Sequence, residues 1–218
     1  MEIHVDVGYI RFDPKDYEFF NQQYFKRLPL PLQLRNLQYR TVSSSILHLL
    51  GNILLEHLSK VTGCKSGILN DISVSKYGRP FIKYMDIDFN KSHTEGCVIC
   101  AIGKNIRVGV DVEKVAALNF DDFTSIMTQP QWKKIYSAEN QLRTFYEYWC
   151  IKESMIKADG RGLSVPLETI KLEDDMGFID TKQWFLHKLE LGSEYVSCLC
   201  VDQSNFTLKV QELDCYNL

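Results

Sequence analysis

The sequence has no long hydrophobic run, no excess of charge of one sign and no low-complexity segment. A helix that crosses a bilayer needs about 20 consecutive, mostly apolar residues, so no such helix is predicted. The formal net charge is −3 over 218 residues, and this balance does not favour a nucleic-acid partner. Residues 1–5 lack the basic start and apolar run of a secretory signal. We therefore expect a cytoplasmic protein in which local cations bind any anionic ligand.

The cysteines do not indicate a disulfide framework, because there are seven of them at irregular spacing. Cys97 and Cys100 form one Cys-x-x-Cys pair inside an apolar, strand-like run, without a second pair at zinc-finger spacing. Free cysteine is among the most buried residue types. We interpret this pair as core thiols in a reducing compartment.

Two charged segments stand out against this ordinary background. Asp111 and Glu113 lie in the short apolar segment 108–113, and on a strand both would project from the same face. Two carboxylates on one face repel each other, and a hard divalent cation would keep both ionised. Farther along, Glu153 and Lys157 are four residues apart and would share one face of a helix.

The remaining pattern predicts an α+β protein. Alternating apolar residues predict strands at 3–9, 72–74, 81–82, 97–102, 108–113, 170–172, 185–189, 195–201 and 206–213. Helical spacing predicts one long helix over 32–58, a shorter one over 120–128 and a second long helix over 137–158 with Ser137 as its N-cap. Ser92 and His93 precede an apolar strand, and on extended backbone their side chains would point in opposite directions.

Each half of the chain repeats a coarse order of early strand, long helix and several short strands. This order predicts two similar α+β halves, residues 1–103 and 104–218, related by a pseudo-twofold axis. We expect the active site in the cleft between them, because ligand sites favour such junctions.

Four motifs in a fixed order resemble the 4′-phosphopantetheinyl transferase superfamily. They are Gly78-Arg79-Pro80, the segment Phe89 to His93, the segment Gly109 to Glu113, and Trp149-x-x-Lys152-Glu153-Ser154-x-x-Lys157. The length and the two-half layout resemble the larger, pseudo-dimeric type typified by the enzyme that activates surfactin synthetase. Members of this superfamily transfer the phosphopantetheine arm of coenzyme A to a serine of an apo acyl or peptidyl carrier protein, and release 3′,5′-ADP.

The resemblance implies that the first half supplies the nucleotide side of the coenzyme A site, and that the second half supplies the magnesium site and the docking surface for the carrier protein. It also assigns roles to particular residues. It implies a magnesium site at Asp111, Glu113 and Glu153, with Lys157 on the coenzyme A diphosphate; these four residues would be catalytic. The 3′-phosphate and nucleotide would be bound by the turn Gly78, Arg79 and Pro80, by Ser92 and His93, by the pair Arg40 and Thr41, and by the basic pair Lys26 and Arg27. A carrier protein is the expected partner of a monomeric enzyme, and Lys152 and Arg161 are expected to attract its acidic surface.

The chemistry requires similar groups. A serine hydroxyl that attacks a phosphodiester needs a cation at the phosphoryl oxygen and a lysine at the leaving phosphate. The hydroxyl must also lose its proton, either to Glu113 or to Glu153, of which we favour Glu153. A glutamate proposed to assist catalysis in some relatives corresponds here to Gln131, which cannot act as a base. Two alternatives to a transferase are a catalytically silent relative that binds coenzyme A or carrier proteins, and a magnesium-dependent phosphohydrolase.

Overall fold

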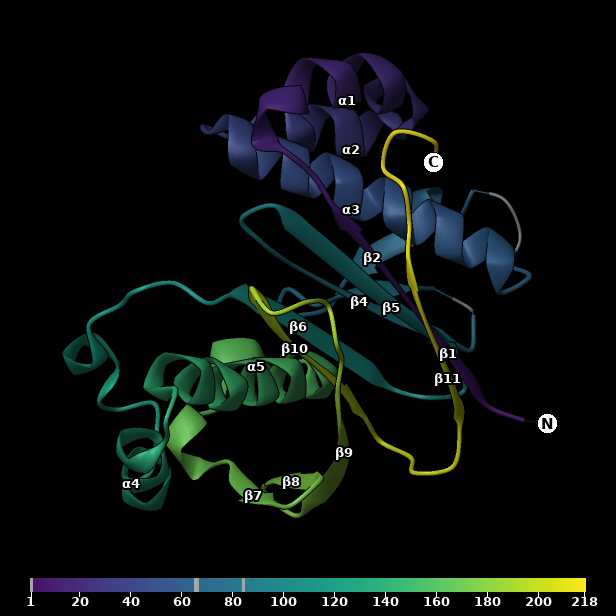
Figure 1. Ribbon diagram of the computed structural model, residues 1–218. Helices are drawn as coiled ribbons and strands as arrows, with labels where there is room; N and C mark the ends of the chain where they lie inside the picture. The colour runs from purple at the N-terminus through teal and green to yellow at the C-terminus, as the bar shows by residue number, and fades with distance from the viewer. Residues whose placement is uncertain (1, 65–66, 84) are drawn as a thin grey trace.

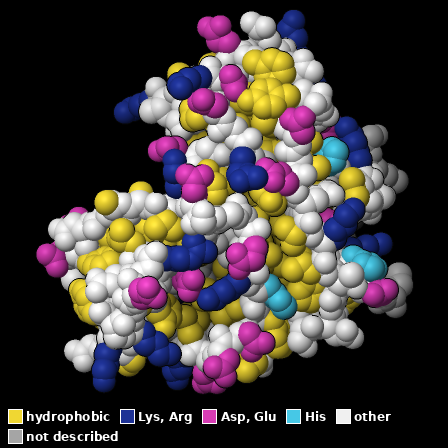
Figure 2. All heavy atoms as spheres, viewed as in Figure 1, with side chains coloured by type: hydrophobic (Ala, Val, Ile, Leu, Met, Phe, Trp, Pro, Cys, Tyr) yellow, Lys and Arg dark blue, Asp and Glu magenta, His cyan; other side chains and the backbone are white. Residues whose placement is uncertain are grey.

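The computed structural model describes residues 2–64, 67–83 and 85–218 and shows two β-sheets, each with helices on its outer face (Figure 1). The predicted α+β class is therefore confirmed. On the face in Figure 2, the basic and acidic side chains of these residues lie interspersed, in keeping with the small net charge. Within the described ranges, no helix combines the length and the apolar character needed to cross a membrane.

The first sheet has four strands in the order β11-β1-β5-β4. They are β11 (Thr207–Glu212), β1 (His4–Arg11), β5 (Cys97–Lys104) and β4 (Ile87–Thr94). β1 runs antiparallel to β5 and parallel to β11, so the last strand of the chain lies beside the first. Residues 207–212 thus join the sheet of the predicted first half, while the division of the chain at residue 103 stays a prediction.

Helices cover the outer face of this sheet. They are α1 (Tyr17–Tyr24), α2 (Leu30–Asn36) and α3 (Val42–Val61). The apolar stripe of α3, which includes Leu50, Ile53 and Leu54, packs against Phe89 and Val98 of the sheet. Three short 3-10 helices flank these helices: η1 (Pro14–Asp16) precedes α1, η2 (Phe25–Arg27) lies between α1 and α2, and η3 (Ile68–Asn70) follows α3. The small hairpin of β2 (Ile72–Val74) and β3 (Pro80–Ile82) follows.

The second sheet has five strands in the order β6-β10-β9-β8-β7. They are β6 (Val108–Lys114), β10 (Tyr195–Val201), β9 (Lys182–Lys188), β8 (Met176–Ile179) and β7 (Lys171–Glu173). The long helix α5 (Gln141–Asp159) packs on its outer face, and α4 (Gln129–Ser137) lies beside α5. Short 3-10 helices are η4 (Phe120–Phe123), η5 (Gly162–Ser164) and η6 (Leu167–Thr169).

The inner faces of the two sheets form a shared apolar core. Val5, Val7 and Ile99 of the first sheet belong to one buried cluster with Val110 and Leu199 of the second. β5 and β10 are buried almost throughout, because both of their faces are covered. Strands covered in this way carry nearly continuous apolar sequence.

The interpretation of the Cys-x-x-Cys pair as core thiols is confirmed. Cys97 and Cys100 are buried and free, and burial raises the pKa of each thiol to about 12. Their side chains fall in different layers, because alternate residues of a strand face opposite sides. A zinc site formed by both thiols is therefore excluded by the strand geometry.

Three of the predicted elements differ from the structure. The long helix over 32–58 is wrong as one element: α2 ends at Asn36, and α3 begins after Thr41, whose hydroxyl accepts a hydrogen bond from the Ser44 backbone. Ser137 ends α4 instead of starting the next helix, and the N-cap of α5 is Asn140. The helix predicted over 120–128 is only the short η4, and the regular helix begins at Gln129.

Candidate active site

The edge strands β4 and β6 meet where the two sheets adjoin, and polar side chains of β4 bridge them. Every second residue of β4 contributes, in the pairs Asp88 Oδ2 with Val108 N (2.9 Å), Asn90 Oδ1 with Val110 N (3.0 Å), Ser92 Oγ with Asp111 Oδ1 (2.7 Å) and Thr94 Oγ1 with Lys114 N (3.2 Å). We call these four bridges the seam. Side chains thus satisfy backbone donors of β6 that no neighbouring strand pairs with on this side.

Asp111 lies at the centre of the seam and is 2% exposed. Its Oδ1 accepts hydrogen bonds from the Ser92 hydroxyl and from Lys157 Nζ, the latter at 2.6 Å. Its other oxygen, Oδ2, is buried and has no hydrogen-bond partner among the described residues. A buried carboxylate oxygen without a partner is costly, so this atom is a candidate ligand for a cation.

Glu113 lies two residues farther along β6. Trp149 Nε1 donates to Glu113 Oε1 at 3.1 Å, which fixes the carboxylate against α5. Burial, and then the nearby Asp111 carboxylate, raise the pKa of Glu113 to about 7. The predicted repulsion between the two carboxylates is therefore present in the structure.

Helix α5 brings Glu153 and Lys157 to these carboxylates. The helix approaches β6 closely at Gly109, where a Cβ atom would lie 2.1 Å from the Ser154 carbonyl oxygen. Glycine is thus required there by the close approach of two backbones. Burial lowers the pKa of Lys157, but the Asp111 charge and hydrogen bond outweigh it, so the pKa is raised. Burial raises the pKa of Glu153, and Asp111 adds to that rise.

The carboxylates fit the chemistry of a magnesium site. Two observations support this fit: Asp111 Oδ2 has no hydrogen-bond partner in the described part of the chain, and the pKa of Glu113 is raised. Both indicate negative charge that the protein leaves uncompensated and that a hard cation would compensate. As the side chains stand in the described residues, no three His, Cys, Asp or Glu groups are close enough to enclose an ion. The assignment of a metal to Asp111, Glu113 and Glu153 therefore stays a prediction.

A pocket of about 380 Å³ lies beside this cluster, between α2, α3, the β2–β3 hairpin and β4. His93 and Ser92 line it together with Gly78 and Pro80, as predicted for the nucleotide site. Arg35, His48 and Lys91 also line it, and sequence reasoning missed all three. None of the lining residues is a carboxylate, so the pocket suits an anion.

Lys91 is unusual among these residues. Its ammonium group donates to Asn52 Oδ1 at 2.7 Å, and burial lowers its pKa to about 8. Its position on β4 places it on the same side as His93 and opposite to Ser92, because strand side chains alternate. The opposite orientation of Ser92 and His93 was predicted. Lys91 precedes them on the same strand, and this position could have identified it as a further pocket residue.

Other predicted nucleotide-binding residues lie outside the lining of this pocket. Arg27 donates to Glu56 and to the Leu218 carbonyl, each at 2.8 Å, and Lys26 beside it is exposed on η2. Arg40 is exposed, and Thr41 caps α3 at the rim, three residues from the pocket residue Ser44. Their proposed contacts with the 3′-phosphate stay predictions.

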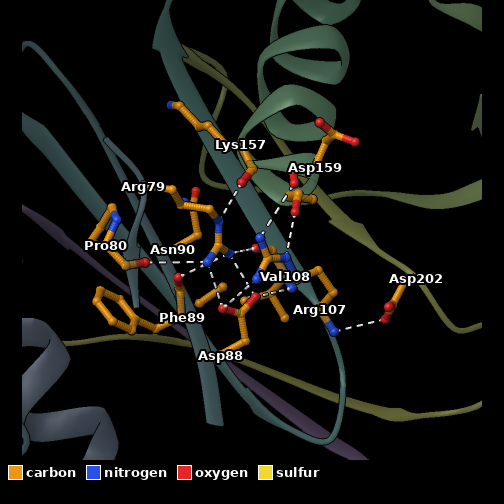
Figure 3. A network of polar contacts seen from close by, with 12 residues as sticks. Arg79, Pro80, Asp88, Phe89, Asn90, Arg107, Val108, Lys157, Asp159 and Asp202 are labelled. Carbon is orange, nitrogen blue, oxygen red and sulfur yellow. Dashed lines mark hydrogen bonds and ion pairs between the residues drawn. The ribbon is translucent and has the colours of Figure 1, made fainter. Parts of the chain in front are cut away.

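Arg79 is turned away from this pocket. Its guanidinium is 6% exposed and contacts Asp88 with two nitrogens, at 2.8 and 2.7 Å (Figure 3). Only its neighbours Gly78 and Pro80 line the pocket. In this conformation the guanidinium is therefore not placed to hold a nucleotide phosphate there.

Two further residues singled out in the sequence have structural roles. Gln131 forms a capping box with Thr128, its Oε1 accepting from the Thr128 backbone at 2.9 Å, and so fixes the start of α4. Lys152 is fully buried and donates to the Ile126 and Leu167 carbonyls at 2.6 and 3.0 Å. The expectation that Lys152 attracts a carrier protein is wrong, because a buried ammonium held by two carbonyls offers no surface charge. Arg161 is bound to Asp159 and Asp180.

Comparison with known proteins gives the family context of this site. The family model of the 4′-phosphopantetheinyl transferase superfamily matches residues 107–200, which include β6 and α5. The predicted resemblance is thereby confirmed: this region of the chain is of the 4′-phosphopantetheinyl transferase superfamily.

Individual relatives extend this result. The chain is 34% identical to the 4′-phosphopantetheinyl transferase gsp of Aneurinibacillus migulanus, over 45% of this chain and 42% of that protein. It is 32% identical to the 4′-phosphopantetheinyl transferase Sfp of Bacillus subtilis, over 47% and 48% of the two chains. A match to the L-aminoadipate-semialdehyde dehydrogenase-phosphopantetheinyl transferase of Schizosaccharomyces pombe has 35% identity over 43% of each chain. The chain thus spans about half the length of the curated relatives it matches.

Proposed function

We propose that this protein transfers the 4′-phosphopantetheine arm of coenzyme A to a serine hydroxyl of an apo acyl or peptidyl carrier protein, releasing 3′,5′-ADP. The observation that carries the proposal is the cluster at the seam, where Lys157 contacts Asp111 and Ser92 next to Glu113 and Glu153. The cluster borders a pocket without carboxylates, and it lies largely in the region that matches the family.

The nucleotide would occupy the pocket of about 380 Å³, with Lys91 and Arg35 as cations for its phosphate. His93 would be a neutral hydrogen-bond donor to it, because burial lowers the pKa of this imidazole. The diphosphate would then extend toward Lys157, whose ammonium group is partly exposed beside Ser92. A hollow of about 290 Å³ offers space for this connection, and its lining includes Lys157, Arg79, Tyr77, Gly78 and Gly162.

In the transfer step the carrier serine oxygen bonds to the β-phosphorus, and the bond from that phosphorus to the bridging oxygen of the diphosphate breaks. The charge that develops on the leaving 3′,5′-ADP would be stabilised by Lys157. Glu153 would accept the serine proton, because burial raises its pKa and no hydrogen bond fixes it within the described residues. Magnesium held by Asp111, Glu113 and Glu153 would supply electrophilic stabilisation of the phosphoryl oxygens when bound.

The direct test is the intact mass of a panel of apo carrier proteins after incubation with the protein, coenzyme A and Mg²⁺, with EDTA in a parallel sample. We expect a gain of one phosphopantetheine arm that is lost with the chelator. No gain on any carrier, with coenzyme A still bound, would favour a silent relative. Release of phosphate from nucleotides without a carrier would favour the phosphohydrolase.

A further inference from the structure

The last turn of α5 ends in a cluster of two arginines and one aspartate that the proposed function does not use. A helix leaves its final carbonyls without intrahelical partners. Here Arg79 Nε donates to the Lys157 carbonyl at 2.8 Å, and Arg107 Nε donates to the Ala158 carbonyl at 2.7 Å (Figure 3). Both arginines come from outside the helix and bring positive charge to its negative end, which is the favourable sign for the helix dipole.

All five N–H groups of Arg79 have partners. Beside the Lys157 carbonyl and the two Asp88 oxygens, its guanidinium donates to the carbonyls of Pro80, Phe89 and Val108, at 3.3, 3.4 and 2.9 Å. Five donors serve six acceptors, so none is left for a ligand. The guanidinium therefore ties together the β2–β3 turn, β4, β6 and the end of α5.

Asp88 balances the charge of this cluster. It pairs with Arg79 and lies 3.6 Å from Arg107 Nη1, and its Oδ2 also accepts the first bridge of the seam, from Val108 N. The side chains of Asp88 and Arg79 are 12% and 6% exposed, so solvent screens their attraction weakly. A buried pair of this kind is strongly disturbed when one partner is removed.

We propose that Arg79 is a positioning residue for Lys157: by binding the Lys157 carbonyl and Asp88 at once, it fixes the end of α5 against the turn whose glycine and proline line the nucleotide pocket. This rests on the proposed function in so far as Lys157 binds the coenzyme A diphosphate. It replaces the expectation that Arg79 contacts the 3′-phosphate. Arg79 thus acts through the main chain of the residue whose side chain meets Asp111.

The test compares Arg79→Gln, Arg79→Lys and the control Arg143→Gln. Arg143 also lies on α5, but in its first turn, where it donates to the Ser193 carbonyl. Two readouts are needed for each variant. The first is kcat and KM for coenzyme A in carrier modification. The second is the rate at which an acetylating reagent labels Lys157 in the whole protein without substrates, followed by mass spectrometry of the digested protein, in the peptide that contains Lys157.

For Arg79→Gln we expect kcat to fall at least tenfold with KM for coenzyme A within twofold of wild type. Lys157 should be labelled at least threefold faster, because its ammonium group is no longer held on Asp111. Arg79→Lys keeps the positive charge but not the five N–H donors of the guanidinium, so kcat and the labelling rate of Lys157 should both be intermediate. Arg143→Gln should match wild type in both.

A rise in KM with unchanged kcat and unchanged labelling would overturn the proposal and place Arg79 on the nucleotide. Unchanged values in all readouts would also overturn it. If Arg79→Gln does not fold by circular dichroism, Arg79→Lys decides between the same outcomes. If wild type modifies no carrier, the proposed function fails, while the labelling of Lys157 still tests the positioning.

Discussion

At the scale of single residues, the site depends on charged side chains that are buried or half-buried. Asp111 receives both Ser92 and Lys157 on one oxygen, and Glu113 is held by Trp149. Glu153 is the remaining acidic group near this cluster, and it is half-buried on α5 without a fixed partner among the described side chains. These different surroundings suit the three carboxylates to different roles in the proposed reaction, with Glu153 as the proton acceptor.

Replacing Glu153 with glutamine should abolish transfer without unfolding the protein. The amide has nearly the same volume but cannot accept the serine proton, and loss of general base catalysis costs about 10²- to 10⁴-fold. The measurement is the rate of mass gain on a carrier protein. Glu147→Gln is the matched control, since Glu147 lies on the same helix and its ion pairs within the described part of the chain are with Arg143 and Lys188 at the surface. Transfer at the wild-type rate would remove Glu153 from the mechanism.

Replacing Lys91 with methionine should stabilise the protein below about pH 8. Burial lowers the pKa of Lys91 from 10.5 to about 8. Between these values the unfolded chain binds more protons, so the stability of the wild type rises with pH across this window, and the full penalty is present below it. We expect Lys91→Met to raise the free energy of unfolding by about 1 to 3 kcal/mol at pH 7.

The measurement for Lys91→Met is urea unfolding at pH 7 and at pH 10, with exposed Lys133→Met as control. The gain should shrink at pH 10, where the wild-type lysine is largely neutral. An equal gain at both values of pH would show that charge burial is not its cause. Weaker binding of coenzyme A is expected alongside, because Lys91 lines the proposed nucleotide pocket.

At the scale of elements, the packing of α5 on β6 sets the distance between the two central motifs. Gly109→Ala should disrupt it, because the new Cβ would meet the Ser154 carbonyl oxygen at 2.1 Å and the Ala158 nitrogen at 2.5 Å, both backbone atoms. We expect a lower melting temperature and loss of transfer together. Gly51→Ala on α3 is the contrasting control: its Cβ would have ordinary 3.6 Å contacts, and alanine favours a helix by about 1 kcal/mol. A Gly109→Ala protein with wild-type melting would contradict the close packing.

Much of the secondary structure could be predicted because apolar periodicity reflects burial. The alternation around Val7, Ile99 and Val110 marks the strands that form the core between the sheets. The break between α2 and α3 was missed, although residues 38–45 carry only Tyr39 and Val42 as apolar side chains and include Thr41, a residue type that favours N-caps. The structure shows that Thr41 caps α3, while its predicted role in nucleotide binding stays a prediction.

The candidate site was predicted less completely than the fold. Asp111 and Lys157 are brought together as the motifs implied, and Ser92 joins them. The seam was not predicted, because it depends on Asp88 and Asn90 facing the main chain of a strand 20 residues away. Sequence assigns a charge to Arg79 but not its partners, which come from four separate elements.

At the scale of the whole molecule, the shared core predicts that both sheets unfold together. All three tryptophans, Trp132, Trp149 and Trp184, lie outside the first sheet, so their fluorescence reports on the second sheet and its helices. Deleting residues 203–218 removes β11 from the first sheet. We expect the free energy of unfolding, followed by tryptophan fluorescence, to fall by about 3 kcal/mol or more, the scale of burying two large apolar side chains.

Lys209→Ala is the control for this deletion, because Lys209 is exposed on β11. Two separate transitions, with the tryptophan signal unchanged by the deletion, would contradict a single cooperative unit. That result would instead support independent units, as the predicted division at residue 103 allows.

The pairing of β1 with β11 also affects how the chain is made on the ribosome. His4 pairs with Thr207, so one edge of β1 stays open until almost the whole chain has been synthesised. At about 5 to 20 residues per second, that wait lasts about 10 to 40 s. An open strand edge is a template for wrong pairing. The nascent chain is therefore expected to expose this edge of β1 to wrong pairing until β11 has been synthesised and can pair with it.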